Sequence, residues 1–187
     1  MVAAWPEPVE RVSSYLREAG AEARIEEFIE GTPTAAEAAA AVGCDLGQIV
    51  KSLVLVCDAN AVLALVPGDR KVDPKKVARA VGASSARVGK PAEVKRATGF
   101  APGAVAPFAL ARVETVLLDR TLLRHPVVWA GAGSKTHIVG LAPFELARLA
   151  RARPVDVVQD QPYDFTSDFS GDSTGGSAGD EAQPKER

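Results

Sequence analysis

The chain has 187 residues, 47% of them hydrophobic and 25% charged, and its formal net charge is −2 at pH 7. This length fits one domain with a sizeable core, and no run of eighteen apolar residues occurs that could span a membrane. Two cysteines are too few for a disulfide scaffold or a cysteine zinc site, and the first residues lack a signal-peptide pattern, so we expect a reduced, cytoplasmic protein with no metal and no membrane partner.

Periodicity and turn signals predict short helices and strands along the whole of this domain. In chain order they are a helix over 8–19, a strand over 24–29, a helix that ends at 43, strands over 49–57 and 61–66, a helix over 75–81, a strand over 86–88, a helix over 91–98, strands over 113–118, 127–130 and 136–141, a helix over 143–150 and a last strand over 155–158. Two helix starts are marked by side chains, the capping box of Thr34 and Glu37 and the N-cap Asp73 before Pro74.

The strands come mostly in hairpin-like pairs and not in strict alternation with helices. This order favours a single-domain α/β fold with a mixed, largely antiparallel sheet and packed helices over a doubly wound nucleotide-binding fold. The stretch Gly131-Ala-Gly133-Ser134 lacks the third glycine of a dinucleotide fingerprint, and a strand follows it in place of a helix. We expect this stretch to be a loop between two strands.

The end of the chain has a different composition. From Asp160 onward, Asp, Ser, Gly and Pro dominate and apolar residues nearly vanish, which is typical of disorder. We therefore expect a domain over 1–158 and a disordered, acidic Ser/Gly-rich tail over 159–187.

The small net charge hides a strong segregation of charged residues. Residues 1–50 carry 3 basic and 9 acidic side chains, residues 51–155 carry 17 and 7, and residues 156–187 carry 2 and 8. A basic middle segment in an acidic protein favours a polyanionic partner such as RNA, and we expect no DNA partner. The alternative is an ordinary basic surface balanced by acidic neighbours.

Lys51 is the first candidate for a functional residue, because it interrupts a run that otherwise predicts a buried strand. A charge in apolar surroundings is costly unless it is paired or has a function. Lys51 could anchor a phosphate or a developing oxyanion, or it could simply extend to solvent from an edge strand.

The second candidate is the loop Gly99–Pro107. Gly103 permits backbone conformations that other residues avoid, and the prolines Pro102 and Pro107 stiffen the loop. Such a loop could hold a substrate carbonyl or be an ordinary surface loop. Phe100 could either fill the core or form a wall for an adenine ring.

A third group of candidates surrounds Gly131. Ser134 and Lys135 could donate to a substrate from the predicted loop, and His137, which lies beside it in the sequence, could have an acid–base role. Cys44 and Cys57 lack an evident partner base, which argues against a cysteine nucleophile. No His, Cys and Asp cluster has the spacing of metal ligands.

Together these residues resemble the YbaK/ProX family of trans-editing aminoacyl-tRNA deacylases, free-standing relatives of the editing domain inserted in bacterial prolyl-tRNA synthetase. The resemblance covers roughly residues 8–158. It rests on three motifs in the family's order and spacing, Gln48-Ile-Val-Lys51-Ser-Leu-Val54, Thr98-Gly-Phe100 with the loop Gly103–Pro107, and Val128-Trp-Ala-Gly-Ala-Gly133.

The resemblance implies a mixed α/β fold and hydrolysis of the ester between a wrong amino acid and the terminal adenosine of a tRNA, usually a prolyl tRNA. Lys51 matches the family's essential lysine, which is implied to hold the carbonyl or the terminal phosphate. The Gly103–Pro107 loop, with Ala104 and Val105, is implied to fix the ester. The family uses water and the ribose hydroxyl, with no cofactor and no protein nucleophile.

Further substrate-binding positions follow from the same resemblance, at Phe28, Gly131 and Gly133. The cysteine-editing branch has a serine before paired glycines and an acid in the next strand, where this chain has Gly131-Ala-Gly133 and Ile138. Alanine, cysteine, 2-aminobutyrate and serine therefore all stay open as the amino acid removed. Prolyl-tRNA synthetase is a candidate partner.

Two other functions remain open from the sequence. One is a non-catalytic module that binds tRNA or aminoacyl adenosine, as a sensor or a synthetase partner. The other is an esterase for small molecules unrelated to tRNA, against which the basic segment argues.

Overall fold

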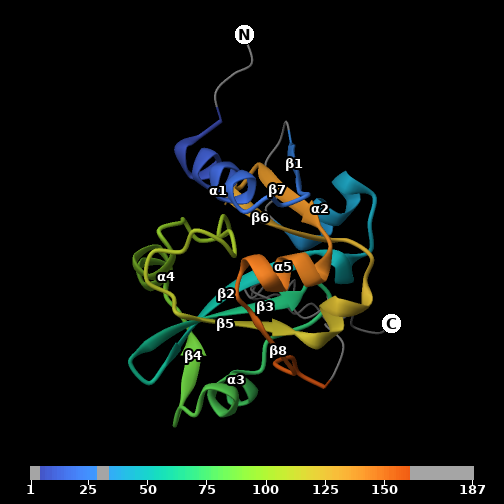
Figure 1. The fold of residues 1–187 in the computed structure, drawn as a ribbon. Helices are drawn as coiled ribbons and strands as arrows, with labels where there is room; N and C mark the ends of the chain where they lie inside the picture. The colour runs from blue at the N-terminus through green and yellow to red at the C-terminus, as the bar shows by residue number, and fades with distance from the viewer. Residues whose placement is uncertain (1–4, 29–33, 161–187) are drawn as a thin grey trace, which may run out of the picture.

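Two β-sheets organise residues 5–28 and 34–160, the ranges that this computed structural model describes (Figure 1). The elements in chain order are α1 (Glu7–Glu18), β1 (Arg24–Glu27), α2 (Ala35–Val42), a 3-10 turn (Leu46–Gln48), β2 (Val50–Cys57), β3 (Asn60–Pro67), α3 (Pro74–Val81), β4 (Ala86–Val88), α4 (Pro91–Thr98), β5 (Thr115–Asp119), a second 3-10 turn (Arg120–Arg124), β6 (Val128–Ser134), β7 (His137–Leu141), α5 (Pro143–Leu149) and β8 (Arg153–Val155). No helix within these ranges is long and apolar enough to cross a membrane.

The larger sheet has the strand order β4-β2-β3-β5-β8. The hairpin β2–β3 is antiparallel and places Lys51 opposite Val66, while β5 and β8 continue the sheet in parallel. β3 is buried on both faces, because Leu63 and Leu65 belong to one core cluster and its neighbours Val62 and Ala64 to another. This explains why the sequence of β3 is almost continuously apolar.

The smaller sheet is antiparallel with the order β1-β7-β6, and Figure 1 shows it above the larger sheet, next to α1 and α2. A single bridge between Ile49 and Trp129 connects the start of β2 with β6. The main core fills the space between the two sheets and α1, and it includes Phe100, Phe108 and Val139. Burying each such side chain contributes about 1.5–3 kcal/mol.

The structure confirms the predicted single-domain, mixed α/β fold and distributes its strands over two sheets. Local signals predicted the helix starts well: Thr34 and Glu37 form the expected capping box, and Asp73 accepts hydrogen bonds from the N–H groups of Lys75 and Lys76. The last strand lies at Arg153–Val155 instead of 155–158.

The predicted loop at Gly131–Ser134 is wrong. These residues form the end of β6, which pairs with β7 through Gly131 and Ile138 and again through Ser134 and His137, with an irregularity between the two pairs. Gly133 takes a φ of 100° at this bulge. Glycines indicated a loop in the sequence, whereas here they permit a strand to bulge and other segments to approach it.

The expected disordered tail over 159–187 lies outside the described residues except for its first two. The N–H of Gln159 donates to Lys71 O at 2.9 Å, and Asp160 pairs with Lys76 at 2.7 Å. The described part of the domain therefore continues to Asp160.

A network at the start of α4 holds this helix to the larger sheet. The carboxylate of Glu93 accepts hydrogen bonds from Arg87 on β4, at 2.7 and 2.8 Å, and from the N–H of Lys90 at 2.7 Å. The Arg87 guanidinium first, and then the Lys90 N–H, lower the pKa of Glu93 from 4.5 to about 2.

Because the pKa of Glu93 is lower in the folded state, its contribution to stability is complete above about pH 4.5 and is lost as the pH falls to about 2. We therefore expect Glu93→Gln to lower the free energy of unfolding at pH 7, and the difference from the unmodified protein to shrink between pH 4.5 and 2. Urea unfolding across this range measures it, with the exposed Glu114→Gln as the control. A difference that stays constant down to pH 2 would contradict the assignment.

Candidate active site

A cavity of about 350 Å³ brings together residues from four parts of the chain. It lies between β2, the sheet of β6 and β7, the start of α2 and the turn at Gly103. Seven of the residues singled out in the sequence line it: Lys51, Gly103, Val105, Gly131, Ser134, Lys135 and His137. Its size is at the lower end of the range for small-molecule sites.

The cavity follows the edge of β2. β4 pairs with only the far end of β2, at Leu55–Cys57, so the segment from Val50 to Leu53 has its outer edge open to the cavity. For this reason both Lys51 and Ser52 line the cavity, although their side chains alternate along the strand. Strand alternation alone predicts that Ser52 points to the face opposite Lys51.

The main chain holds the Lys51 side chain. Lys51 is half-buried, and its Nζ donates to the carbonyl oxygen of Arg70 at 2.5 Å. At Gly68, two positions before Arg70, a Cβ would lie 2.5 Å from Leu46 O, so a glycine is needed there for this segment to pack against the 3-10 turn before β2. An ammonium has three donors, so the bond to Arg70 O does not use all of the hydrogen-bonding capacity of Lys51.

Gly103 occupies a tight turn that only glycine adopts easily. Its φ is 79°, it follows Pro102, and the N–H of Ala104 closes the turn on Ala101 O at 3.0 Å. Proline followed by a residue with positive φ is the sequence of a type II turn. The N–H of Ala104 is therefore used within the turn, and Gly103 presents exposed backbone to the cavity.

Two glycines of β6 allow the surrounding segments to approach the strand closely. A Cβ at Gly131 would lie 2.7 Å from Val105 O, and one at Gly133 would lie 2.6 Å from Pro8 O. Gly131 thus seats the loop that contains Gly103 and Val105 against the sheet, and Gly133 seats the start of α1. Gly133 does not line the cavity.

His137 is the buried polar group of the site, with 1% of its surface exposed. Its Nδ1 lies 2.7 Å from Ser134 Oγ and 3.0 Å from Thr136 Oγ1. Its Nε2 is buried, and among the described residues it has no hydrogen-bond partner; Glu27 Oε1 lies 3.7 Å away. A buried ring nitrogen without a partner is costly.

The structure places the other predicted residues behind or beside the cavity. Phe100 is 1% exposed in the main core, where the Arg11 guanidinium lies 4.5 Å from its ring centre. Ala104 and Pro107 are buried behind the turn. Phe28 is half-buried at the end of β1, where its N–H donates to Thr136 O at 2.8 Å.

Sequence reasoning did not propose as site residues several others that line the cavity, among them Ser52 and Trp129. Ser52 Oγ is buried and has no hydrogen-bond partner among the described residues. The shortness of the strand predicted over 86–88 was the available signal, because a three-residue partner leaves part of β2 uncovered.

Neither cysteine lines the cavity. Burial first, and then the nearby charges of Asp45 and Asp58, raise the pKa values of Cys44 and Cys57, so both stay thiols and weak nucleophiles. Within residues 5–28 and 34–160 no group of three or more His, Cys, Asp and Glu side chains could hold a metal ion. A larger hollow of about 870 Å³ on the other side of Trp129 contains none of the predicted site residues.

Comparison with known proteins gives matches over most of the described domain. The aminoacyl-tRNA editing domain family matches residues 29–149. Protein YwhH of Bacillus subtilis is 35% identical over 138 residues, which cover 73% of this chain and 87% of that protein.

Two further matches are to proteins connected with prolyl-tRNA synthesis. A proline–tRNA ligase of Nitratidesulfovibrio vulgaris is 34% identical over 110 residues, which cover 58% of this chain and 19% of the ligase, so the chain corresponds to one part of that enzyme. The crystal structure of a candidate trans-editing enzyme for prolyl tRNA synthetase superposes with a TM-score of 0.78 at 38% identity, covering 83% of this chain and 99% of the other.

The contact between Gly131 and Val105 generates a prediction about the shape of the cavity. Gly131→Ala should push the Val105 carbonyl away and displace the Gly103 turn, because the added Cβ would lie 2.7 Å from that oxygen. We expect a loss of stability of about 1–3 kcal/mol and shifts in the amide resonances of Gly103, Ala104 and Val105, measured by urea unfolding and NMR.

The control for this experiment is Gly82→Ala. Gly82 has a φ of 71°, and a Cβ added there would meet no neighbouring atom within 4 Å. This change therefore costs about 1–2 kcal/mol through backbone strain alone and leaves the Gly103 turn in place. Unchanged amide resonances of the turn in Gly131→Ala would show that Gly131 does not seat the loop.

Proposed function

The chain belongs to the aminoacyl-tRNA editing domain family, and from this we propose that it hydrolyses the ester between a mischarged small amino acid and the 3′ end of a tRNA, namely a prolyl tRNA. The reaction would clear wrongly charged tRNA and support the fidelity of translation, with prolyl-tRNA synthetase as a candidate partner. The similarity to part of a proline–tRNA ligase supports the choice of tRNA.

One observation carries this proposal. Lys51 and Gly103, which are far apart in the sequence, line the same small cavity. An ammonium group opposite a tight glycine turn is an arrangement that can bind a carbonyl group and stabilise negative charge on its oxygen. Ala35 and Ala38 line the cavity on the side of α2, and its volume of about 350 Å³ suits a small amino acid.

The chemistry requires little from the protein. Water adds to the ester carbonyl, the bond between that carbon and the ribose oxygen breaks, and the products are the free amino acid and the tRNA with its hydroxyl restored. Lys51 would stabilise the oxyanion that develops, or hold the terminal phosphate. The Gly103 turn and His137 would orient the ester, and orientation alone supplies a large share of the rate.

A covalent route through Ser134 is the rival mechanism, because its Oγ lies 2.7 Å from the Nδ1 of His137 and a hydroxyl beside a base is the pattern of a nucleophile. The same Oγ accepts the N–H of Thr136 at 3.1 Å and contacts Thr136 Oγ1 at 3.1 Å. These bonds hold Ser134 within the β6–β7 turn, so we assign it to orienting His137.

The first test is hydrolysis of prolyl tRNA charged separately with alanine, cysteine, 2-aminobutyrate, serine and proline. We expect selective loss of one small amino acid, and a decrease of about 10²–10³-fold in turnover for Lys51→Ala, the size typical of removing one oxyanion donor. Lys75→Ala, an exposed lysine on α3, is the matched control and should be unaffected.

Full activity of Lys51→Ala would overturn the mechanism. Saturable binding of tRNA without hydrolysis of any of these esters would favour a non-catalytic binding module instead.

Ser134→Ala distinguishes the two mechanisms. If Ser134 only orients His137, we expect turnover to fall by about tenfold or less, and mass spectrometry of the unmodified protein during turnover to detect no acyl adduct. An acyl-enzyme, or a loss as large as that of Lys51→Ala, would support the covalent route.

A further inference from the structure

We propose that Arg11 and Lys95 form a phosphate-binding site for the strand of the tRNA that leads into the cavity. This inference rests on the proposed function, because it names the contact by which the same site would hold its substrate. Three observations support it: two cations from different helices converge on Gly99, the charge of Arg11 is incompletely paired, and the loop from Gly99 leads to the cavity.

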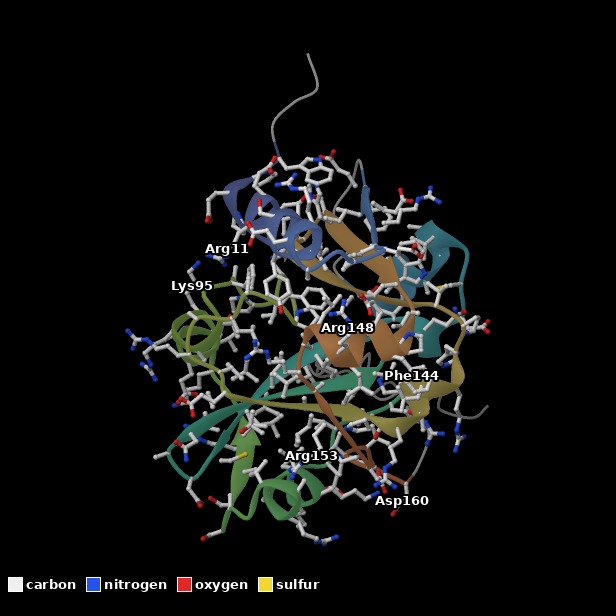
Figure 2. All side chains as sticks on the ribbon, viewed as in Figure 1. Arg11, Lys95, Phe144, Arg148, Arg153 and Asp160 are labelled. Atoms are coloured by element: carbon white, nitrogen blue, oxygen red, sulfur yellow. The ribbon has the colours of Figure 1, made fainter. Side chains whose placement is uncertain are left out.

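The two cations, Arg11 and Lys95, lie near each other (Figure 2), and both approach Gly99. Lys95 on α4 donates from its Nζ to Gly99 O at 2.9 Å. On α1, Arg11 lies so close that a Cβ at Gly99 would be 3.5 Å from its Nη2. Capping of the α4 C-terminus explains Lys95, but it does not explain why a second helix brings an arginine to the same residue.

The protein itself neutralises Arg11 only weakly. Nε and Nη2 are buried and have no hydrogen-bond partner among the described residues, and the ion pair with Glu7 is 3.7 Å long with Glu7 76% exposed. Stacking on Phe100 fixes the guanidinium plane. The side chain is 36% exposed, and because Nε and Nη2 are buried, Nη1 is the guanidinium nitrogen that a ligand next to Lys95 can reach.

Two neighbouring cations repel each other, and an anion between them removes this cost. A phosphate oxygen suits the pair, because Nη1 of Arg11 and the ammonium of Lys95 can each donate a charge-assisted hydrogen bond to it. The surface at Gly99 therefore fits the backbone of a nucleic acid better than an uncharged partner.

The pair of Arg11 and Lys95 lies at the start of the loop that leads to the cavity. Gly103 follows Gly99 by four positions, so their Cα atoms lie at most about 15 Å apart. Ala101, Pro102 and Gly103 are exposed, and the Lys135 side chain lies 3.8 Å from the Cβ position of Gly103. Four cations thus line the path along this loop from the surface into the cavity: Lys95, Arg11, Lys135 and Lys51. A tRNA strand whose terminal ester lies in the cavity would require such a path.

The test measures binding of uncharged tRNA at several salt concentrations, for Arg11→Gln, Lys95→Gln and the double variant. Removing each phosphate contact should raise Kd several-fold at low salt and reduce the slope of log K against log salt by about 0.7–0.9. Lys75→Gln is the charge-matched control on α3, at the opposite end of the molecule from α1 (Figure 1), and Arg11→Lys and Lys95→Arg should retain most of the slope.

Because binding is measured with uncharged tRNA, the result is independent of hydrolysis and of the outcome for Lys51→Ala. With charged tRNA, kcat/KM should fall through a higher KM, and the loss should be smaller on an aminoacyl adenosine, which has no phosphate. Thermal melting confirms that each variant is folded. Slopes and Kd values equal to those of Lys75→Gln would overturn the proposal, as would equal losses on both substrates.

Discussion

The close approach of Val105 to Gly131 is the contact on which the candidate site depends. With a Cβ at Gly131 the distance to the carbonyl oxygen would be 2.7 Å, so only glycine allows the Gly103 turn to rest on β6. The next glycine, Gly133, similarly admits the start of α1 at Pro8. β6 therefore holds both a loop and a helix, so these contacts position the Gly103 turn beside Lys135 and the helix that carries Arg11.

The chemistry inside the cavity is correspondingly sparse. Lys51 supplies the positive charge, bound to the carbonyl of Arg70, and His137 supplies a ring that two hydroxyls orient. The thiols of Cys44 and Cys57 lie elsewhere and have raised pKa values. A cavity with these groups can bind and orient an ester for attack by water, which agrees with the small demand that hydrolysis of an activated ester makes on a catalyst.

The features that could be predicted from the sequence are those that local interactions determine. The caps at Thr34 and Asp73 were predictable because each involves residues two or three positions apart, and the β2–β3 hairpin because its turn is short. The division into two sheets and the end of β6 were not, since they depend on which distant segments meet. Gly131 and Gly133 indicated a loop because a glycine required by a neighbour looks the same in sequence as a glycine required by a turn. The burial of Phe100 in the core likewise depends on how distant segments pack. Ser52 lines the cavity because β4 is short, which the alternation of side chains along β2 does not predict.

There is a physical reason why the protein would combine a small cavity with a charged outer surface. One methylene group changes binding in an apolar pocket by only about 1–3 kcal/mol, so a cavity of about 350 Å³ discriminates mainly by excluding what does not fit. Such a site gains little affinity from a small amino acid. The affinity has to come from the remainder of the substrate, which for a tRNA means its phosphates. An excess of basic residues in 51–155, with cations along the loop that ends at the cavity, is the charge distribution that this division of tasks requires.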